Sequence, residues 1–536
     1  MADKRVYTSS IPFEPFTGSL SELLESSPYL RVRRDKPILV DAATGERVTA
    51  AQHFDFVRAL SYVLATEHGV RPGDVVGLFC PNHIRLIALN HALMAVGAVV
   101  TPMNIAYTGE DVREQLTTAR ARLVFAADGH WLDVATRAVG GAVAVASFEQ
   151  IVAAARATRG RRDAVPLAAA SDAALAYLCF SSGTTGKFKG VMTSHSNLAN
   201  NTLQTLLAES ELMGPDHVVG AFLPQSHIFG LTMHVYLAVY AAATVVVFPS
   251  FGLEPFLAAT VTYGITLAHV VPPVVVLLAK SPLVARFPAL TETLRTLVSG
   301  AAPLSASLAL ALQARFDNAL TVVQGYGLTE TSPVLHMLPP SRPDSRAGSI
   351  GRLVPGVRAR LVDEAGADVA PGQPGEILVQ GVNVMMGYLD NAAATAATFA
   401  DGWLRTGDVG QVDADGYWTI VDRAKELIKS KGFQVAPSEL EALLLTHAGV
   451  LDAAVVGVYD DAAATEQPRA FVVLAAGTEP GAVKRWLDGQ VARHKRLWGG
   501  LVVLDQIPKS PSGKILRRVL RARSGDVVHG GRDARL

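Results

Sequence analysis

Apolar residues recur along the first part of the chain in two alternating patterns. Residues 54–67 carry apolar side chains at three- and four-residue spacing, which is typical of one face of a helix. Short apolar runs at 74–80 and 98–103 predict buried strands, and the longer segment 83–97 between them predicts a second helix. This strand–helix–strand order predicts mainly parallel sheets covered by helices, the arrangement of α/β proteins.

The pattern continues beyond residue 190 and then changes twice. The continuation predicts a helix at 197–207 and strands at 218–223, 244–248 and 267–271. Short alternating segments separated by turns then predict a small β-rich subdomain at 357–362, 375–380 and 417–421. From residue 425 about 110 residues of mixed helix and strand, including an amphipathic helix at 483–494, predict a smaller α+β domain. We therefore expect a large N-terminal domain at 1–424 and a C-terminal domain at 425–536.

Composition excludes several classes of protein. A chain of 536 residues with 49% hydrophobic residues suits two or three folded domains. Lys+Arg and Asp+Glu number 48 each, so no net charge favours nucleic acid or an anionic membrane as a partner. Cys80 and Cys179 lie in apolar runs and predict buried core thiols in a reducing compartment. The most apolar segments, 236–249 and 265–280, are respectively too short to span a bilayer and interrupted by two prolines, so no membrane span is expected.

A loop rich in glycine and hydroxyl groups follows the apolar strand predicted at 174–180. The next ten residues hold three Gly, four hydroxyl side chains and two Lys. Small residues allow close approach of the backbone, successive N–H groups form an anion-binding nest, and lysines add positive charge. The spacing is not that of a Walker loop. The pattern indicates either a polyphosphate site or a mobile surface turn, with the candidate contacts Ser181, Ser182, Gly183, Thr184, Thr185 and Lys189.

A second candidate site is the segment Gln324-Gly325-Tyr326-Gly327-Leu328-Thr329-Glu330. Its glycines permit close approach of a flat ring on which Tyr326 can stack, and Thr329 can donate a hydrogen bond to a phosphate. Glu330 offers a hard oxygen suited to Mg²⁺. The alternative is a turn with a solvated glutamate.

Three further stretches carry candidate chemistry. Asp408 follows Thr-Gly, and Arg423 comes fifteen residues later. Taken by itself, the lysine-rich stretch 422–434 is typical of the basic end of a helix followed by a glycine turn. Lys514 ends the Pro/Gly-rich segment 508–514, where a lysine is normally solvated. Asp408 alone would usually cap its own turn.

Taken in this order from residue 174 to 514, the motifs resemble those of the adenylate-forming superfamily, which includes acyl- and aryl-CoA ligases such as the 4-coumarate–CoA ligases. One departure is Phe188, where the family usually has Pro; its loss loosens the loop backbone but removes no phosphate contact. The resemblance implies a two-step reaction that joins a small carboxylic acid to AMP and then transfers it to CoA, with ATP, Mg²⁺ and CoA as cofactors or co-substrates.

The resemblance also implies individual roles. The nucleotide would be bound by the loop residues and by Ala302, Gln324, Gly325, Tyr326, Thr329, Asp408, Arg423 and Lys425. Glu330 would hold Mg²⁺, and Lys514 would be the catalytic lysine. Lys425 would be the pivot of a mobile C-terminal domain, Lys429 and Gln434 would serve thioester formation, and Lys431 and Gly432 would line the CoA tunnel.

The acid site is implied by a further segment, His227-Ile228-Phe229-Gly230, which resembles the element that gates the acid in coumarate-type ligases. His227 would act there, although an ordinary core histidine is the alternative. The acyl pocket would be lined by Phe229, Ala301, Pro333, Val334 and Met337. Phe229 and Met233 replace positions that often carry Tyr and a small polar residue, which favours less hydroxylated aromatic or aliphatic acids, either an aryl propenoic or a medium-chain fatty acid.

Other functions stay open at this point. They are an acyl-AMP ligase that loads a carrier protein, a luciferase-like oxygenase, and a non-catalytic nucleotide-binding regulator; the combination of Lys514, Glu330, Asp408 and Lys429 argues against the regulator. We expect a monomer or homodimer in the cytoplasm. The C-terminal Ala534-Arg535-Leu536 resembles variants of the peroxisomal Ser-Lys-Leu signal, so a peroxisomal location is the alternative in a eukaryote.

Overall fold

The computed structural model describes residues 5–158, 171–182, 188–208, 210–211, 213–339, 346–430, 433–460, 465–510 and 513–530. Five predicted site residues lie outside these ranges: Gly183, Thr184, Thr185, Lys431 and Gly432. The tripeptide Ala534-Arg535-Leu536 also lies outside them. Among the described residues, no helix is both long and apolar enough to cross a membrane.

The first layer is a seven-stranded sheet with its strands in the order β19 (Gly387–Tyr388), β9 (Phe188–Ser194), β8 (Leu175–Ser182), β5 (Val99–Pro102), β4 (Val75–Phe79), β6 (Leu123–Ala126) and β7 (Ala144–Ser147). The strands from β8 to β7 are parallel, as the sequence predicts, whereas β9 and β19 are antiparallel. Its helices are α3 (Ala50–Thr66), α4 (Ile84–Ala95), α5 (Gly109–Thr118), α6 (His130–Val139), α7 (Phe148–Ala157) and α8 (His195–Ala208). The apolar run predicted at 174–180 is thus β8, and β8 and β9 flank the glycine-rich loop.

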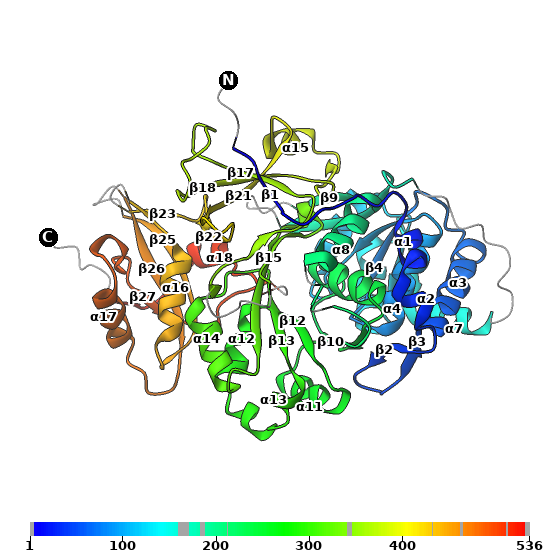
Figure 1. Ribbon diagram of the computed structural model, residues 1–536, viewed down its shortest axis with the longest axis horizontal. Coiled ribbons are helices and arrows are strands. Elements are labelled where there is room, and N and C mark those ends of the chain that lie inside the picture. Colours follow the sequence, from blue (N-terminus) through cyan, green and yellow to red (C-terminus); the bar gives the residue numbers. More distant parts are fainter. Residues whose placement is uncertain are drawn as a thin grey trace.

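The second layer is a nine-stranded sheet with its strands in the order β16 (Arg352–Leu353), β15 (Val334–Met337), β14 (Thr321–Gly327), β13 (Thr296–Ser299), β12 (Leu267–Val270), β10 (Val218–Ala221), β11 (Thr244–Val247), β2 (Pro37–Asp41) and β3 (Arg47–Thr49). The strands from β14 to β2 are parallel. Helix α4 is buried all round and contacts both β5 and β2, so it lies between the two sheets and joins their cores (Figure 1).

Further helices of the large domain pack on these two sheets and on their helices. They are α1 (Leu20–Ser26), α2 (Pro28–Val32), α9 (Ile228–Gly230), the π-helix Leu231–Leu237, α10 (Ala238–Tyr240), α11 (Leu253–Tyr263), α12 (Pro272–Lys280), α13 (Leu290–Thr293) and α14 (Ala306–Arg315), with 3₁₀ turns at Pro282–Arg286 and Thr329–Thr331. The apolar run at 265–280 is therefore a strand followed by a helix. Pro272 and Pro273 begin that helix, since proline fits the first helical turn, where its missing N–H is not needed.

An antiparallel sheet forms the predicted β-rich subdomain. It contains β1 (Tyr7–Thr8), β17 (Arg358–Val362), β18 (Gly375–Gln380), β20 (Phe399–Ala400), β21 (Trp403–Val412) and β22 (Trp418–Arg423), with α15 (Ala392–Thr398) beside it. Its yellow strands lie above the junction between the green sheet and the orange C-terminal part (Figure 1). The last strand, β22, leads directly into that C-terminal part.

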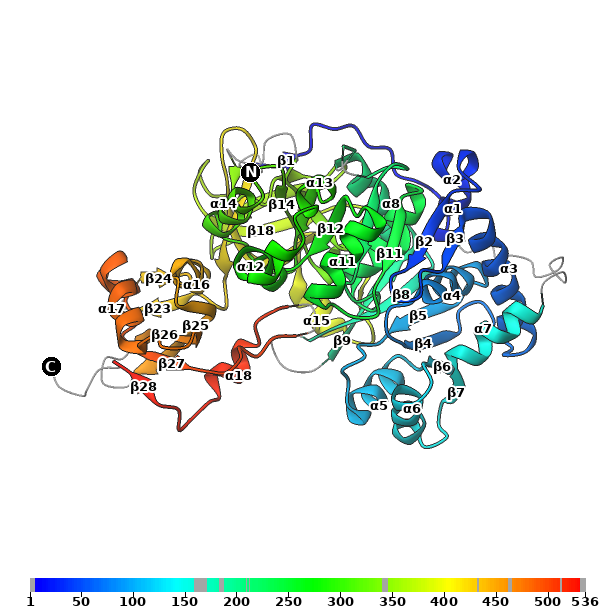
Figure 2. The same ribbon diagram turned by 90° about the horizontal axis from the view of Figure 1, so that it is seen from below.

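The C-terminal part has its own hydrophobic core, which begins at Ile428 and includes Leu440, Val455 and Leu487. Its elements are β23 (Ile428–Ser430), β24 (Phe433–Val435), α16 (Pro437–Thr446), β25 (Val450–Asp460), β26 (Thr465–Leu474), α17 (Pro480–Gln490), a 3₁₀ turn at Arg493–Lys495, β27 (Leu501–Val503), α18 (Arg517–Arg521) and β28 (Val528–His529). The helix predicted at 483–494 thus starts and ends earlier than expected. Figure 2 shows the red segment ahead of α18 reaching from this part toward the large domain.

Candidate active site

A cavity of about 480 Å³ lies where the two large sheets, the β-rich subdomain and the C-terminal part meet. This volume is within the range of small-molecule sites, roughly 300–1,000 Å³. The predicted site residues that line it are Lys189, His227, Phe229, Ala301, Gly325, Tyr326, Thr329, Glu330, Pro333, Val334, Met337, Arg423, Lys425 and Lys514. The cavity therefore brings together residues from six separated stretches of sequence.

One wall is organised around the buried carboxylate of Asp408. Strands β21 and β22 pair so that Asp408 lies opposite Arg423, whose Nε is 3.2 Å from its Oδ1. The Tyr326 hydroxyl donates a hydrogen bond of 2.6 Å to Oδ2. Burial raises the pKa of Asp408, while Arg423 and the Tyr326 hydroxyl oppose that rise. The two neighbours thus hold a carboxylate, able to accept hydrogen bonds, directly behind the cavity wall.

A second carboxylate, Glu330, projects from the 3₁₀ turn after β14. The Tyr388 hydroxyl donates to its Oε1 at 2.8 Å, and the Nζ of Lys189 lies 4.8 Å from the centre of the Tyr388 ring. Lys189 is on β9, so the strand that leaves the glycine-rich loop reaches the same wall as Glu330. Within the described ranges, no cluster of three or more His, Cys, Asp or Glu side chains forms a ready-made metal site.

Lys514 enters the cavity from a tight turn of the C-terminal part. The Ser510 N–H donates to the Lys514 carbonyl at 2.8 Å, and the Lys514 N–H donates to the Ser510 hydroxyl at 3.1 Å. Gly513 has φ of +80°, and a Cβ there would lie 3.2 Å from Val271. The turn thus needs glycine both for its backbone conformation and for its close approach to the large domain.

The charge state of Lys514 is set by this environment. Burial, and after it the Arg423 cation, lower its pKa, while Asp408 and Glu330 oppose the change; together they bring the pKa from 10.5 to about 8. Burial and then repulsion from Lys514 lower the pKa of His227 to about 4, so this imidazole is neutral at pH 7. His227 caps α9, with its Nδ1 accepting the Phe229 N–H at 3.2 Å.

Part of the cavity lining is apolar. It is formed by Phe229, Ala301, Pro333, Val334 and Met337, the residues proposed from the sequence for the acyl pocket. Gly325 lies opposite Met337 across β14 and β15, and a Cβ at Gly325 would come 3.0 Å from the Met337 Cε. The absence of a side chain at Gly325 thus leaves room for the Met337 side chain, which lines the cavity.

Some predicted residues lie outside the cavity. Ala302 does not line it, and Gln324 is buried with its side chain accepting the Leu304 N–H and donating to the Ser349 carbonyl. Lys429 and Gln434 are exposed and face each other across the β23–β24 hairpin. The structure therefore brings this pair together, but away from the cavity that holds Lys514.

Sequence reasoning missed Tyr388, which supports Glu330, and a buried histidine pair behind Phe229. His234 and His269 have ring centres 5.3 Å apart, and His269 meets the Phe229 ring edge-on at 5.8 Å. Both histidines are fully buried, and burial lowers the pKa of each. Neither Tyr388 nor the pair has a local motif, because each contact joins elements that meet only in the folded chain; His234 is in the π-helix and His269 on β12.

Comparison with known proteins agrees with this geometry. Residues 29–389 match the family model of the AMP-binding enzymes, and residues 439–514 match the model of the AMP-binding enzyme C-terminal domain. The chain belongs to the AMP-binding enzyme family. Its relatives include 4-coumarate–CoA ligase 5 of Oryza sativa subsp. japonica, 39% identical over 510 residues that cover 92% of each chain. The probable 4-coumarate–CoA ligase 1 of Dictyostelium discoideum is 36% identical over 92% of this chain and 93% of its own.

Solved structures share the whole architecture. ATP-bound MatB from Rhodopseudomonas palustris superposes with a TM-score of 0.84 at 28% identity, covering 94% of this chain and 98% of that one. The anthranilate CoA ligase AuaEII, in complex with anthranoyl-AMP, has a TM-score of 0.86 at 24% identity and covers 95% and 98%. At this identity, the similarity to AuaEII supports the fold and not the function.

Proposed function

We propose that the protein is an AMP-forming acid–thiol ligase that converts a carboxylic acid to acyl-AMP and then to an acyl-CoA thioester. The observation that carries the proposal is the meeting of Lys514, Glu330 and Arg423 in one cavity whose lining is partly apolar. The Lys514 and Arg423 cations suit the negative charges of a carboxylate and of the ATP phosphates. The apolar residues beside them suit the rest of an acid. The named activity of the 4-coumarate–CoA ligase relatives adds support.

In the first half-reaction the acid carboxylate attacks the α-phosphate of ATP and pyrophosphate leaves. Lys514 would donate hydrogen bonds to the oxygens on which negative charge develops, since preorganised cations and donors stabilise such charge best in a site with little water. The Asp408 carboxylate, oriented by Tyr326 and Arg423, would accept the ribose hydroxyls. Lys189 and the loop before it would bind the outer phosphates.

The site residues fit one Mg²⁺ ion. Such ions in nucleotide enzymes are usually held by one or two carboxylates together with substrate phosphates, and Glu330 offers one carboxylate at the cavity wall. Bound there, the ion would neutralise phosphate charge. The Tyr388 hydroxyl would keep the carboxylate oriented by its hydrogen bond to Oε1.

In the second half-reaction the CoA thiol displaces AMP. Lys429 and Gln434 lie on an exposed hairpin, so their proposed role requires the C-terminal domain to turn about Lys425 and bring that hairpin to the cavity. This motion divides the chain at 424/425 and is a gating step between two reactions.

The acid that we propose is an aryl propenoic or medium-chain fatty acid. Phe229, Val334 and Met337 offer apolar contact and no hydrogen-bond donor for a phenolic hydroxyl. An unsubstituted ring or an alkyl chain should therefore bind better than a hydroxylated ring, whose hydroxyl would be buried without a partner.

Separate assays of the two half-reactions test the proposal. Pyrophosphate release is measured with a panel of acids, with and without CoA, and thioester formation is measured from pre-made acyl-AMP. Lys514→Ala should lose adenylation by about 100-fold or more, the usual effect of removing one such contact, and keep thioester formation; Lys429→Ala should show the reverse. Lys484→Ala is a matched control, because Lys484 pairs with Asp488 within α17. Release of AMP only with a holo carrier protein, or equal loss of both half-reactions in Lys514→Ala, would contradict the proposal.

A further inference from the structure

Lys280, at the end of helix α12 in the large domain, forms hydrogen bonds to the C-terminal domain. Lys280 is the last residue of α12, and its Nζ donates to the carbonyls of Leu445 at 3.0 Å and Val450 at 2.7 Å. Leu445 is in the last turn of α16, where carbonyls have no partner within the helix and the helix dipole is negative. Val450 begins β25, at a point where its ladder with β26 shifts register. The positively charged Lys280 ammonium, with three N–H donors, can therefore bond both carbonyl oxygens at once.

The other end of α12 also contacts the C-terminal domain. Gly513, beside Lys514, lies so close to Val271 and Pro273 that a Cβ would be 3.2 Å from the first and 3.6 Å from the second. The nine residues of α12 span roughly 13 Å between these contacts. One contact would leave the C-terminal domain free to rotate about it, whereas two separated contacts restrict its orientation.

The end of α12 is itself held within the large domain. Arg315 of α14 donates to the carbonyls of Leu278 and Ala279 at 3.1 and 2.7 Å, and to the Ser281 carbonyl at 2.6 Å. These bonds satisfy two of the last carbonyls of α12 and the carbonyl of the residue that follows it. Lys280 therefore extends from a fixed backbone.

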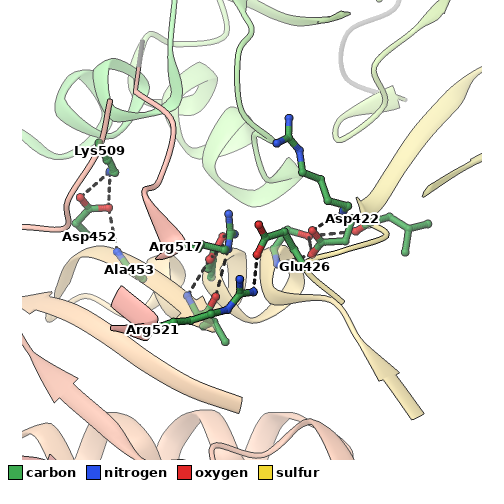
Figure 3. Close-up of polar contacts among 12 residues, drawn as sticks. Asp422, Glu426, Asp452, Ala453, Lys509, Arg517 and Arg521 are labelled. Carbon is green, nitrogen blue, oxygen red and sulfur yellow. Dashed lines mark hydrogen bonds and ion pairs between the residues drawn. The ribbon is translucent and has the colours of Figure 1, made fainter. Parts of the chain in front are cut away.

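The acceptors of Lys280 are connected to the turn that carries Lys514. Asp452 follows Val450 by two residues, and Lys509 donates to both of its carboxylate oxygens at 2.8 and 2.6 Å (Figure 3). Lys509 forms a β-bridge with Ile515, so it lies at the base of the Lys514 turn. Burial lowers the pKa of Lys280 and the Asp452 carboxylate opposes that change.

We propose that Lys280 is a positioning residue, which holds the C-terminal domain in the orientation that puts Lys514 in the cavity. The inference rests on the proposed function, because this orientation matters only if Lys514 takes part in acyl-AMP formation. Rotation of the domain for the second half-reaction must break both bonds from Lys280. The residue therefore favours the first half-reaction and adds nothing to the second.

The first test compares half-reactions in single-turnover assays. Lys280→Met, which keeps the apolar stem, should slow acyl-AMP formation about tenfold, the lower end of what one charged hydrogen bond contributes. Thioester formation from pre-made acyl-AMP should be unchanged or faster. Lys280→Arg should restore most of the first rate. Arg286→Met is the matched control, because Arg286 pairs with Glu254 inside the large domain.

The second test measures domain orientation directly. Dyes on Val261→Cys and Val503→Cys, which are 37% and 39% exposed, report the distance between the two domains, and the native Cys80 and Cys179 are buried. Lys280→Met should broaden the distance distribution and Arg286→Met should not. An unchanged distribution, equal loss of both half-reactions, or unchanged acyl-AMP formation beside an active wild type would overturn the inference. If the wild type adenylates no acid, the proposed function is wrong, while the distance measurement still decides the role of Lys280.

Discussion

The rate of acyl-AMP formation should fall above pH 8, because Lys514 loses its charge there. The cavity lowers the pKa of this lysine from 10.5 to about 8, which corresponds to about 3 kcal/mol of lost stability of the charged form. The free enzyme should then carry the charge in about 90% of molecules at pH 7, half at pH 8 and about 10% at pH 9. Since kcat/KM reports the free enzyme, it should drop tenfold per pH unit above pH 8.

Lys514→Arg provides the decisive perturbation. A guanidinium stays charged throughout the range, so the fall above pH 8 should disappear even though the changed geometry lowers the overall rate. The assay is pyrophosphate release at low substrate concentration from pH 6.5 to 10, with circular dichroism to exclude unfolding. Neither a carboxylic acid nor ATP titrates between pH 8 and 10. An equal fall in Lys514→Arg, or a wild-type fall that begins above pH 9.5, would refute the assignment of the charge to this lysine.

Three other outcomes follow from the buried groups. Tyr326→Phe removes the hydrogen bond to Asp408 and should raise the KM for ATP about fivefold to tenfold, a change of about 1–1.5 kcal/mol, whereas the KM for the acid should stay constant. Arg517→Met leaves the buried Glu441 carboxylate without its partner at 2.7 Å and should destabilise the protein by about 3–5 kcal/mol in urea unfolding; a change below about 1 kcal/mol would contradict the stabilising role of this pair. Burial lowers the pKa of His269 to about 3, so this residue by itself should lower the stability by about 2 kcal/mol when the pH drops from above 6.5 to 5. Because burial also lowers the pKa of other histidines such as His234, His269→Leu should reduce the fall in unfolding free energy by about that amount without abolishing it, and an unchanged slope against pH would contradict the prediction.

The sequence predicted the architecture where local pattern and tertiary environment agree. The strand–helix rhythm predicted the parallel sheets, since buried parallel strands are nearly continuous apolar runs. The motifs around Tyr326 and Lys514 identified residues that line one cavity. The Val483–His494 prediction erred because helical periodicity continued past the point where the helix ends, at Gln490.

By itself the sequence determined the family, the alternation of strands and helices, and most of the residues proposed for the site, because glycine, hydroxyl and charged side chains at fixed spacing carry that chemistry locally. Only the tertiary structure decided that Tyr388 supports Glu330, that Gln324 binds backbone rather than the cavity, and that Lys280 reaches the C-terminal domain. The physical reason is that these contacts join strands and helices far apart in the chain, and their distances depend on how whole sheets and domains pack. The same packing lowers the pKa of Lys514, which no local pattern around that lysine could set.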